Sequence, residues 1–170
     1  MRRQSVLFLL AMACTPSTPT LDAAHRLAII DSVETRLTAF RAAVGGMQAD
    51  SVAQFYLADS TFRWIEDGEV RYHSRAEVAT AIRDAAPFMS DASLLYDGTV
   101  ITPLAPGVAS IVTGFAQKFT TPDGQRAGFA GAITAVMVDT PDGWMFQSGH
   151  TSSVHPRQDS VAVTPAGGAR

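Results

Sequence analysis

The second half of the chain constrains the fold most, because it consists of long strand-like segments separated by turn signals. The turns are PLAPG at 103–107 and the tetrad TPDG at 121–124 and again at 140–143. Proline presets the first turn dihedral and glycine accepts the left-handed one, so each sequence predicts a tight turn. Strands of about a dozen residues exceed the usual length and are expected to curl. The predicted strands are Leu94–Thr102, Val108–Thr120, Arg126–Asp139 and Trp144–Val154.

The first half of the chain has a helical pattern instead. Apolar residues recur at spacings of three and four over 21–44, from Leu27 through Val33 and Leu37 to Phe40 and Val44, which predicts one long amphipathic helix. Its expected N-cap is Thr20, and Gly45-Gly46 ends it. A second, short helix is expected to be capped by Asp50.

A hairpin and a third helix are predicted between these two halves. From Phe62 to Glu66 the apolar period is two, and Asp67-Gly68 is a strong two-residue hairpin signal. Ser74 and Glu77 form a capping box for the third helix, which should end before Pro87. The order of elements predicts an α+β domain, a curled antiparallel sheet wrapped round the long N-terminal helix. The curled sheet and the helix together enclose a cone. Side chains of the core fill its closed end, and its open end forms a pocket.

Three stretches also resemble a known family. These are RAAVGGMQADSVAQFYLADSTF at 41–62, EDGEVRYHSRAEVATAIRD at 66–84 and DGWMFQSGHTSS at 142–153. Together with the order of elements they resemble the nuclear transport factor 2-like superfamily, in its SnoaL-like branch, over Leu21–Val154. The resemblance implies the cone-shaped, cystatin-like half-barrel and a homodimer formed through the open sheet face. It does not settle function, because the superfamily includes isomerases, epoxide hydrolases, cyclases and members that only bind or assemble.

The charge composition limits the classes of partner that the chain can bind. The formal net charge is −3, and it becomes −5 without Arg2 and Arg3, which lie in a segment expected to be removed. A mildly acidic chain with one lysine lacks the basic field that nucleic-acid binding needs. We therefore expect no nucleic-acid partner.

The N-terminus is typical of an export signal. MRRQ is cationic, and SVLFLLAMA is apolar but too short to span a bilayer. Cys14, the only cysteine, follows AMA at once, which resembles the lipobox of bacterial lipoproteins. We predict a signal peptide at 1–13, a lipidated Cys14 with a tether to residue 20, the domain at 21–154 and a disordered tail at 155–170. The alternative is an ordinary secretory signal that leaves a soluble, exported protein with a free thiol.

The last strand supplies the first candidate site. Trp144, Phe146, Ser148, His150 and Ser152 alternate along it, so the row begins apolar and ends polar. We predict that this row faces the pocket, with His150 as the candidate acid–base residue. The alternative for His150 is a structural role. The ligand-binding residues expected from all strands are Trp64, Phe115, Gln117, Phe129, Phe146, Ser148, His150 and Ser152.

Simpler roles are open to several of these residues. Glu66 shares a strand face with Trp64 but adjoins the Asp-Gly turn, so we expect it to be solvated, with Trp64 as core or pocket wall. Phe115 and Gln117 could line the pocket, or they could equally well pack against the long helix. The four histidines show no ligand spacing, so no metal and no cofactor are expected.

These features predict a lipid-anchored, extracytoplasmic domain that binds a small, mostly apolar molecule. An isomerase, cyclase or hydratase that uses His150 is the alternative, and an interaction module with a filled cone is the third possibility.

Overall fold

The computed structural model describes residues 21–154. The predicted signal peptide, the tether with Cys14 and the tail lie outside the described residues. Within 21–154 no helix is both long and apolar enough to cross a bilayer. The elements follow the predicted order and are α1 (Ala23–Gly45), α2 (Ala49–Ala53), β1 (Arg63–Glu66), β2 (Glu69–Tyr72), α3 (Arg75–Ala85), the 3-10 turn η1 (Ala86–Phe88), β3 (Ser90–Ala105), β4 (Val108–Thr120), β5 (Arg126–Thr140) and β6 (Gly143–Ser153).

The helix starts differ in part from the predicted caps. Asp22, rather than Thr20, caps α1, and its carboxylate accepts a hydrogen bond from the His25 backbone N–H at 2.8 Å. Gln48 stands at the N-cap of α2, with Asp50 in the first turn. The predicted cap of α3 is confirmed, because the Ser74 hydroxyl accepts from the Glu77 N–H at 3.2 Å.

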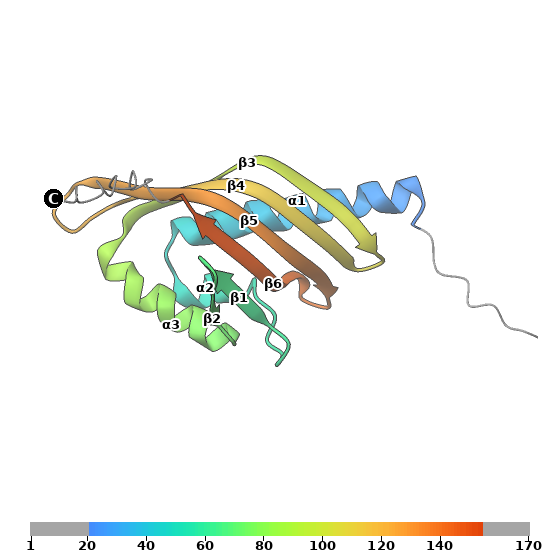
Figure 1. The fold of residues 1–170 in the computed structure, drawn as a ribbon, viewed down its shortest axis with the longest axis horizontal. Coiled ribbons are helices and arrows are strands. Elements are labelled where there is room, and N and C mark those ends of the chain that lie inside the picture. Colours follow the sequence, from blue (N-terminus) through green and yellow to red (C-terminus); the bar gives the residue numbers. More distant parts are fainter. Residues whose placement is uncertain (1–20, 155–170) are drawn as a thin grey trace, which may run out of the picture.

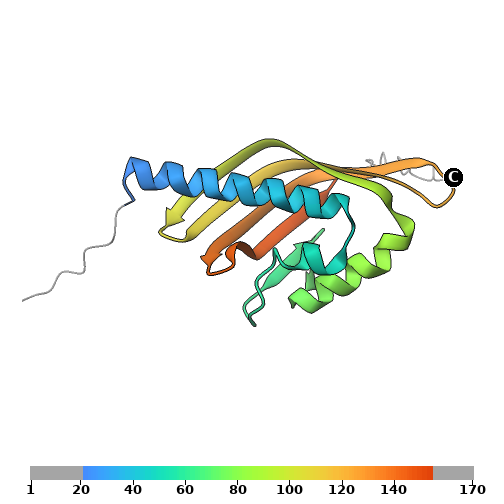
Figure 2. The ribbon, with the colours of Figure 1, turned by 180° about the vertical axis from the view of Figure 1, so that it is seen from behind.

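The long helix α1 crosses the concave side of the sheet (Figure 2). Its buried stripe consists of Val33, Leu37, Phe40 and Val44, as the periodicity predicts. Leu27, predicted to belong to the stripe, is instead 61% exposed. In Figure 2 the N-terminal end of α1 extends past the sheet, and Leu27 belongs to this end.

The sheet has six strands in the order β2-β1-β6-β5-β4-β3 and curls strongly (Figure 1). Neighbouring strands are antiparallel except β1 and β6, which run parallel, so the sheet is mixed rather than wholly antiparallel. The predicted hairpin turn is confirmed: Asp67 and Gly68 have φ of 50° and 93°. The helices α2 and α3 lie beside this hairpin at one end of the concave side (Figure 1).

Arginines tie the helices to the sheet through backbone carbonyl oxygens. From α1, Arg36 Nε donates to Trp144 O at 2.7 Å and Arg41 Nε donates to Leu94 O at 3.0 Å. From α3, Arg75 Nε donates to Tyr56 O at 2.6 Å. These contacts fix the helices at a set distance from the strands.

A bulge in β6 decides which of its side chains face the concave side. Val136 pairs with Ser148, whereas Met137 pairs with Phe146, so Gln147 is an extra residue without a partner position on β5. Simple alternation would place Phe146, Ser148 and His150 on one face. After the bulge the parity is reversed, so that Phe146 and Gly149 share the concave face and Ser148 and His150 do not.

Candidate functional site

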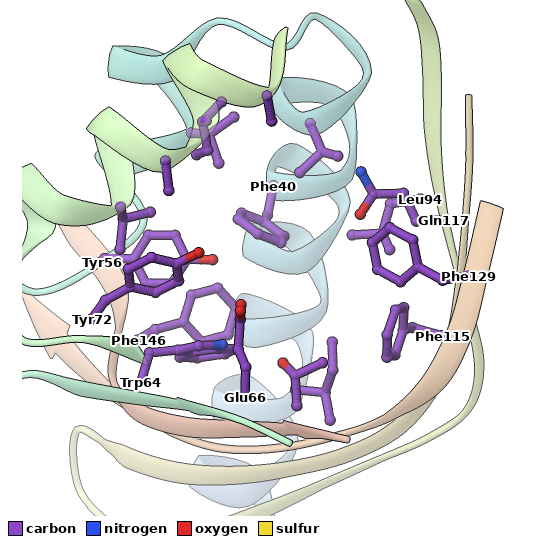
Figure 3. Close-up of a pocket in the computed structure, with 18 of the residues that line it drawn as sticks. Phe40, Tyr56, Trp64, Glu66, Tyr72, Leu94, Phe115, Gln117, Phe129 and Phe146 are labelled. Carbon is purple, nitrogen blue, oxygen red and sulfur yellow. The ribbon is translucent and has the colours of Figure 1, made fainter. Parts of the chain in front are cut away.

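A cavity of about 330 Å³ lies between the concave face of the sheet and the helices α1 and α3 (Figure 3). This volume falls at the lower end of the usual range for small-molecule sites. Most of its wall is apolar, with Leu37, Val44, Val78 and Ile82 contributed by helices. The cone predicted from the order of elements is therefore hollow.

An aromatic cluster forms the base of the cavity. Phe40 meets Tyr56 and Phe146 edge to face, with ring centroids 5.9 and 5.2 Å apart. Trp64 meets Tyr56 and Phe146 in the same way, at 5.5 and 5.6 Å. Edge-to-face pairs contribute about 0.5–1.5 kcal/mol each beyond burial, so these rings form a rigid wall.

Five of the predicted ligand-binding residues line the cavity: Trp64, Phe115, Gln117, Phe129 and Phe146. The Gln117 amide points inward among apolar neighbours (Figure 3). Phe129 is 45% exposed and stands edge to face with Phe115 at 5.9 Å, so it forms part of the rim. That these residues bind a ligand stays a prediction.

The other three predicted residues, Ser148, His150 and Ser152, do not line the cavity, so that prediction is wrong. The Gln147 bulge reverses the alternation of β6, and Thr151 and Ser153 line the cavity in their place. Gly149 shows the new parity directly, because a Cβ built on it would lie 2.2 Å from the Trp64 ring. His150 pairs with Ile65 and Thr134 on the convex face. A role for His150 as acid–base residue of this cavity is excluded by that placement.

Glu66 lines the cavity while its side chain is 38% exposed, so it is partly solvated and also faces the cavity. The turn is held against β6: the Asp67 N–H donates to Thr151 O at 2.9 Å, and the Ser153 N–H donates to Asp67 Oδ1 at 2.6 Å. These bonds keep Glu66 beside Thr151, its partner in register. The carboxylate therefore projects into the cavity, next to Trp64 (Figure 3).

Burial raises the pKa of Glu66 above its usual 4.5. The guanidinium of Arg71, 4.0 Å from Glu66 Oε2, opposes this rise, and the negative charge of Asp67 adds to it. Arg71 is 61% exposed, so water screens its effect. A carboxyl group with a raised pKa in an apolar cavity is suited to proton transfer.

Three tyrosine hydroxyls add to the polarity of the cavity wall. Burial raises the pKa of Tyr56, Tyr72 and Tyr96, and the charge of Glu66 raises the pKa of Tyr56 and Tyr72 further. All three therefore stay protonated at neutral pH and can donate a hydrogen bond.

The sequence contained a signal for Glu66 but none for the parity of β6. Glu66 lies two residues after Trp64, and both keep a regular register with β6, so alternation places them on one face. The sequence did not predict Thr151 and Ser153 as cavity-lining residues, because nothing in the stretch Gln147-Ser148-Gly149 indicates a bulge at Gln147. Among the described residues, no group of three or more His, Cys, Asp and Glu side chains is arranged to hold a metal ion.

The pKa of Glu66 leads to a prediction about stability. A carboxyl group whose pKa is higher in the folded state stabilises the fold while it is protonated and loses that contribution as pH rises through the folded-state pKa. Glu66→Gln cannot ionise, so its free energy of unfolding relative to wild type should increase as pH rises above the usual carboxyl pKa, and should level once the folded-state carboxyl group of wild type is fully ionised. Urea unfolding of both proteins at several pH values measures this. A difference that is constant with pH would show that the pKa is not raised.

Comparisons with known proteins agree on the fold. No family model and no curated protein matches the sequence. Among solved structures, a proposed scytalone dehydratase from Novosphingobium aromaticivorans superposes with a TM-score of 0.69 at 9% identity, over 76% of this chain and 86% of that one. A nuclear transport factor 2-like superfamily protein from Salmonella enterica gives 0.67 at 13% identity, over 79% and 97%.

A protein with a cystatin-like fold from Caulobacter vibrioides gives a TM-score of 0.59 at 21% identity, over 75% of this chain and 90% of that one. Identities this low carry the fold and not the activity. The fold expected from the sequence resemblance is confirmed: the chain has the nuclear transport factor 2-like fold.

Proposed function

We propose that this domain binds a small, mostly apolar molecule in the cavity between α1, α3 and the sheet. The observation that carries the proposal is a hollow of about 330 Å³ lined by eight aromatic side chains and a few polar groups. A cavity of this composition buries apolar ligand surface, and its polar groups set the orientation of the ligand. Glu66, Gln117 and Tyr72 are the groups best placed to do so.

Filling the cavity tests the proposal. Ala81 lines it from α3, so Ala81→Phe should occupy part of the volume and weaken binding by about tenfold or more, equivalent to 1.4 kcal/mol. Ala76 is exposed on the same helix and does not line the cavity, so Ala76→Phe is the matched control and should bind normally. Thermal-shift screening against steroids, terpenoids and aromatic polyketides, followed by calorimetry, measures this. Binding that is unchanged by Ala81→Phe would contradict the proposal.

A second candidate function, an isomerase, dehydratase or cyclase, is favoured by the state of Glu66. A half-buried carboxyl group with a raised pKa faces the cavity beside protonated tyrosines. Glu66 would take a proton from carbon, and a tyrosine hydroxyl would stabilise the oxygen that gains charge. This assigns the acid–base role to Glu66 in place of His150.

Turnover would separate the enzyme from the binding protein. If Glu66 is the base, the rate should fall as pH drops through its raised pKa, and Glu66→Gln should lose about 10²-fold or more in kcat. The measurement is the pH–rate profile of any compound found to be converted. Conversion by Glu66→Gln at the wild-type rate would exclude this role.

We also propose that the protein is an exported, lipid-anchored homodimer. The anchor is supported by the sequence around Cys14. The dimer is supported by the convex sheet face, where Leu95, Val100 and Val112 are 44–58% exposed. Leu95 pairs there with the small residue Ala116, and Val100 pairs with Val112. An apolar face of this kind is suited to pairing with its own copy.

Native mass spectrometry of the full chain, extracted in detergent from its own membrane, tests both statements. The expected species is a dimer whose chains begin at an acylated Cys14. Val112→Glu should give monomers, whereas Leu27→Glu, on the exposed start of α1, should remain dimeric. An unmodified cysteine would refute the anchor, and a wild-type monomer would refute the dimer.

A further inference from the structure

We infer that the cavity selects an organic cation: a small apolar molecule whose ammonium group lies against Glu66 and the aromatic rings beside it. This inference rests on the proposed binding function and adds the class of ligand to it. Three independent features of the described residues point in this direction, namely the charge of the wall, its aromatic content and the engagement of the nearby arginines.

The charged groups of the cavity wall are all acidic. Glu66 and Asp67 line it, and no lysine, arginine or histidine does so in the part of the chain that the structure describes. The groups that face Glu66 are Arg71 and Tyr72 from β2, Asp67 from the turn and Tyr56 after α2. Of these only Arg71 is cationic, and its 4.0 Å contact lies on the exposed side. An anionic ligand in the cavity would therefore meet repulsion from Glu66.

The nearby arginines are occupied elsewhere. Arg36, Arg41 and Arg75 donate to backbone carbonyl oxygens, and Arg36 also lies over the Phe55 ring at 4.0 Å. They hold helices to strands and contribute no side chain to the cavity wall. These three arginines are therefore not placed to offset the charge of Glu66.

Aromatic rings lie beside the carboxylate. Trp64, Tyr56 and Tyr72 lie on the same side of the cavity as Glu66 in Figure 3. The negative face of an aromatic ring attracts cations by about 0.5–2 kcal/mol, most strongly where water is excluded. A carboxylate among such rings therefore provides both charge and shape for an ammonium group. The aromatic side chains that line the cavity are Phe40, Tyr56, Trp64, Tyr72, Tyr96, Phe115, Phe129 and Phe146.

A matched set of probes tests the inference. Phenyltrimethylammonium carries a permanent charge, tert-butylbenzene is its neutral carbon isostere, and 4-tert-butylbenzoate is an anion of similar size. We expect the full-length protein to bind the cation at least about tenfold more tightly than the neutral isostere at pH 7.5, and the anion least tightly. The Kd values are measured by NMR titration at fixed ionic strength.

Charge-matched variants identify the group responsible. Glu66→Gln should weaken binding of the cation by about tenfold and leave tert-butylbenzene unaffected. Glu34→Gln removes the same charge from the exposed side of α1 and should change neither. Because the probe does not titrate, wild-type affinity for it should fall as pH drops through the raised pKa of Glu66. This pH dependence should disappear in Glu66→Gln.

The outcomes separate this inference from the proposed function. If the cation and its isostere bind equally, or if Glu66→Gln has no effect on the cation, the cationic ligand is refuted while the binding cavity stands. If the anion binds best, the inference is refuted in the same way. If no probe binds and no compound responds to Ala81→Phe, both are refuted.

Discussion

The contact between the Trp64 ring and Gly149 holds the rest of the site in place. Any side chain at residue 149 would overlap the indole, since even a Cβ would lie 2.2 Å from it. The contact joins β1 to β6, the one parallel pair of the sheet, and thereby brings the hairpin under the cavity. Glu66, two residues further along β1, lies on the same face as Trp64, and the Asp67 hydrogen bonds to β6 hold it there.

How far the sequence predicts this molecule depends on which elements follow regular periodicity. The helix stripe, the Asp67-Gly68 turn and the Ser74 cap were all predictable, because each rests on local chemistry. The face presented by residues 148–153 was not, since one inserted residue reverses every later side chain. The parallel pairing of β1 with β6 is a long-range event that no local pattern indicates.

The same bulge divides the polar residues of β6 between two surfaces. Thr151 and Ser153 join the cavity, whereas His150 joins the convex row of Val112, Thr134 and Ile65. The titratable group that looks most suited to chemistry in the sequence therefore belongs to the outer face. The inner face keeps a carboxyl group, which differs from an imidazole in bearing negative charge when it ionises.

This exchange determines what the cavity can recognise. A neutral imidazole accepts or donates a proton without adding a negative field, whereas Glu66 adds one among rings whose faces are already electron-rich. Burial makes the ionised form costly, and Arg71 relieves that cost only from the exposed side. A ligand that brings its own positive charge relieves it from the cavity side, where less water reaches the carboxylate and the attraction is stronger. The raised pKa and the preference for a cation are thus two consequences of one half-buried, incompletely compensated charge.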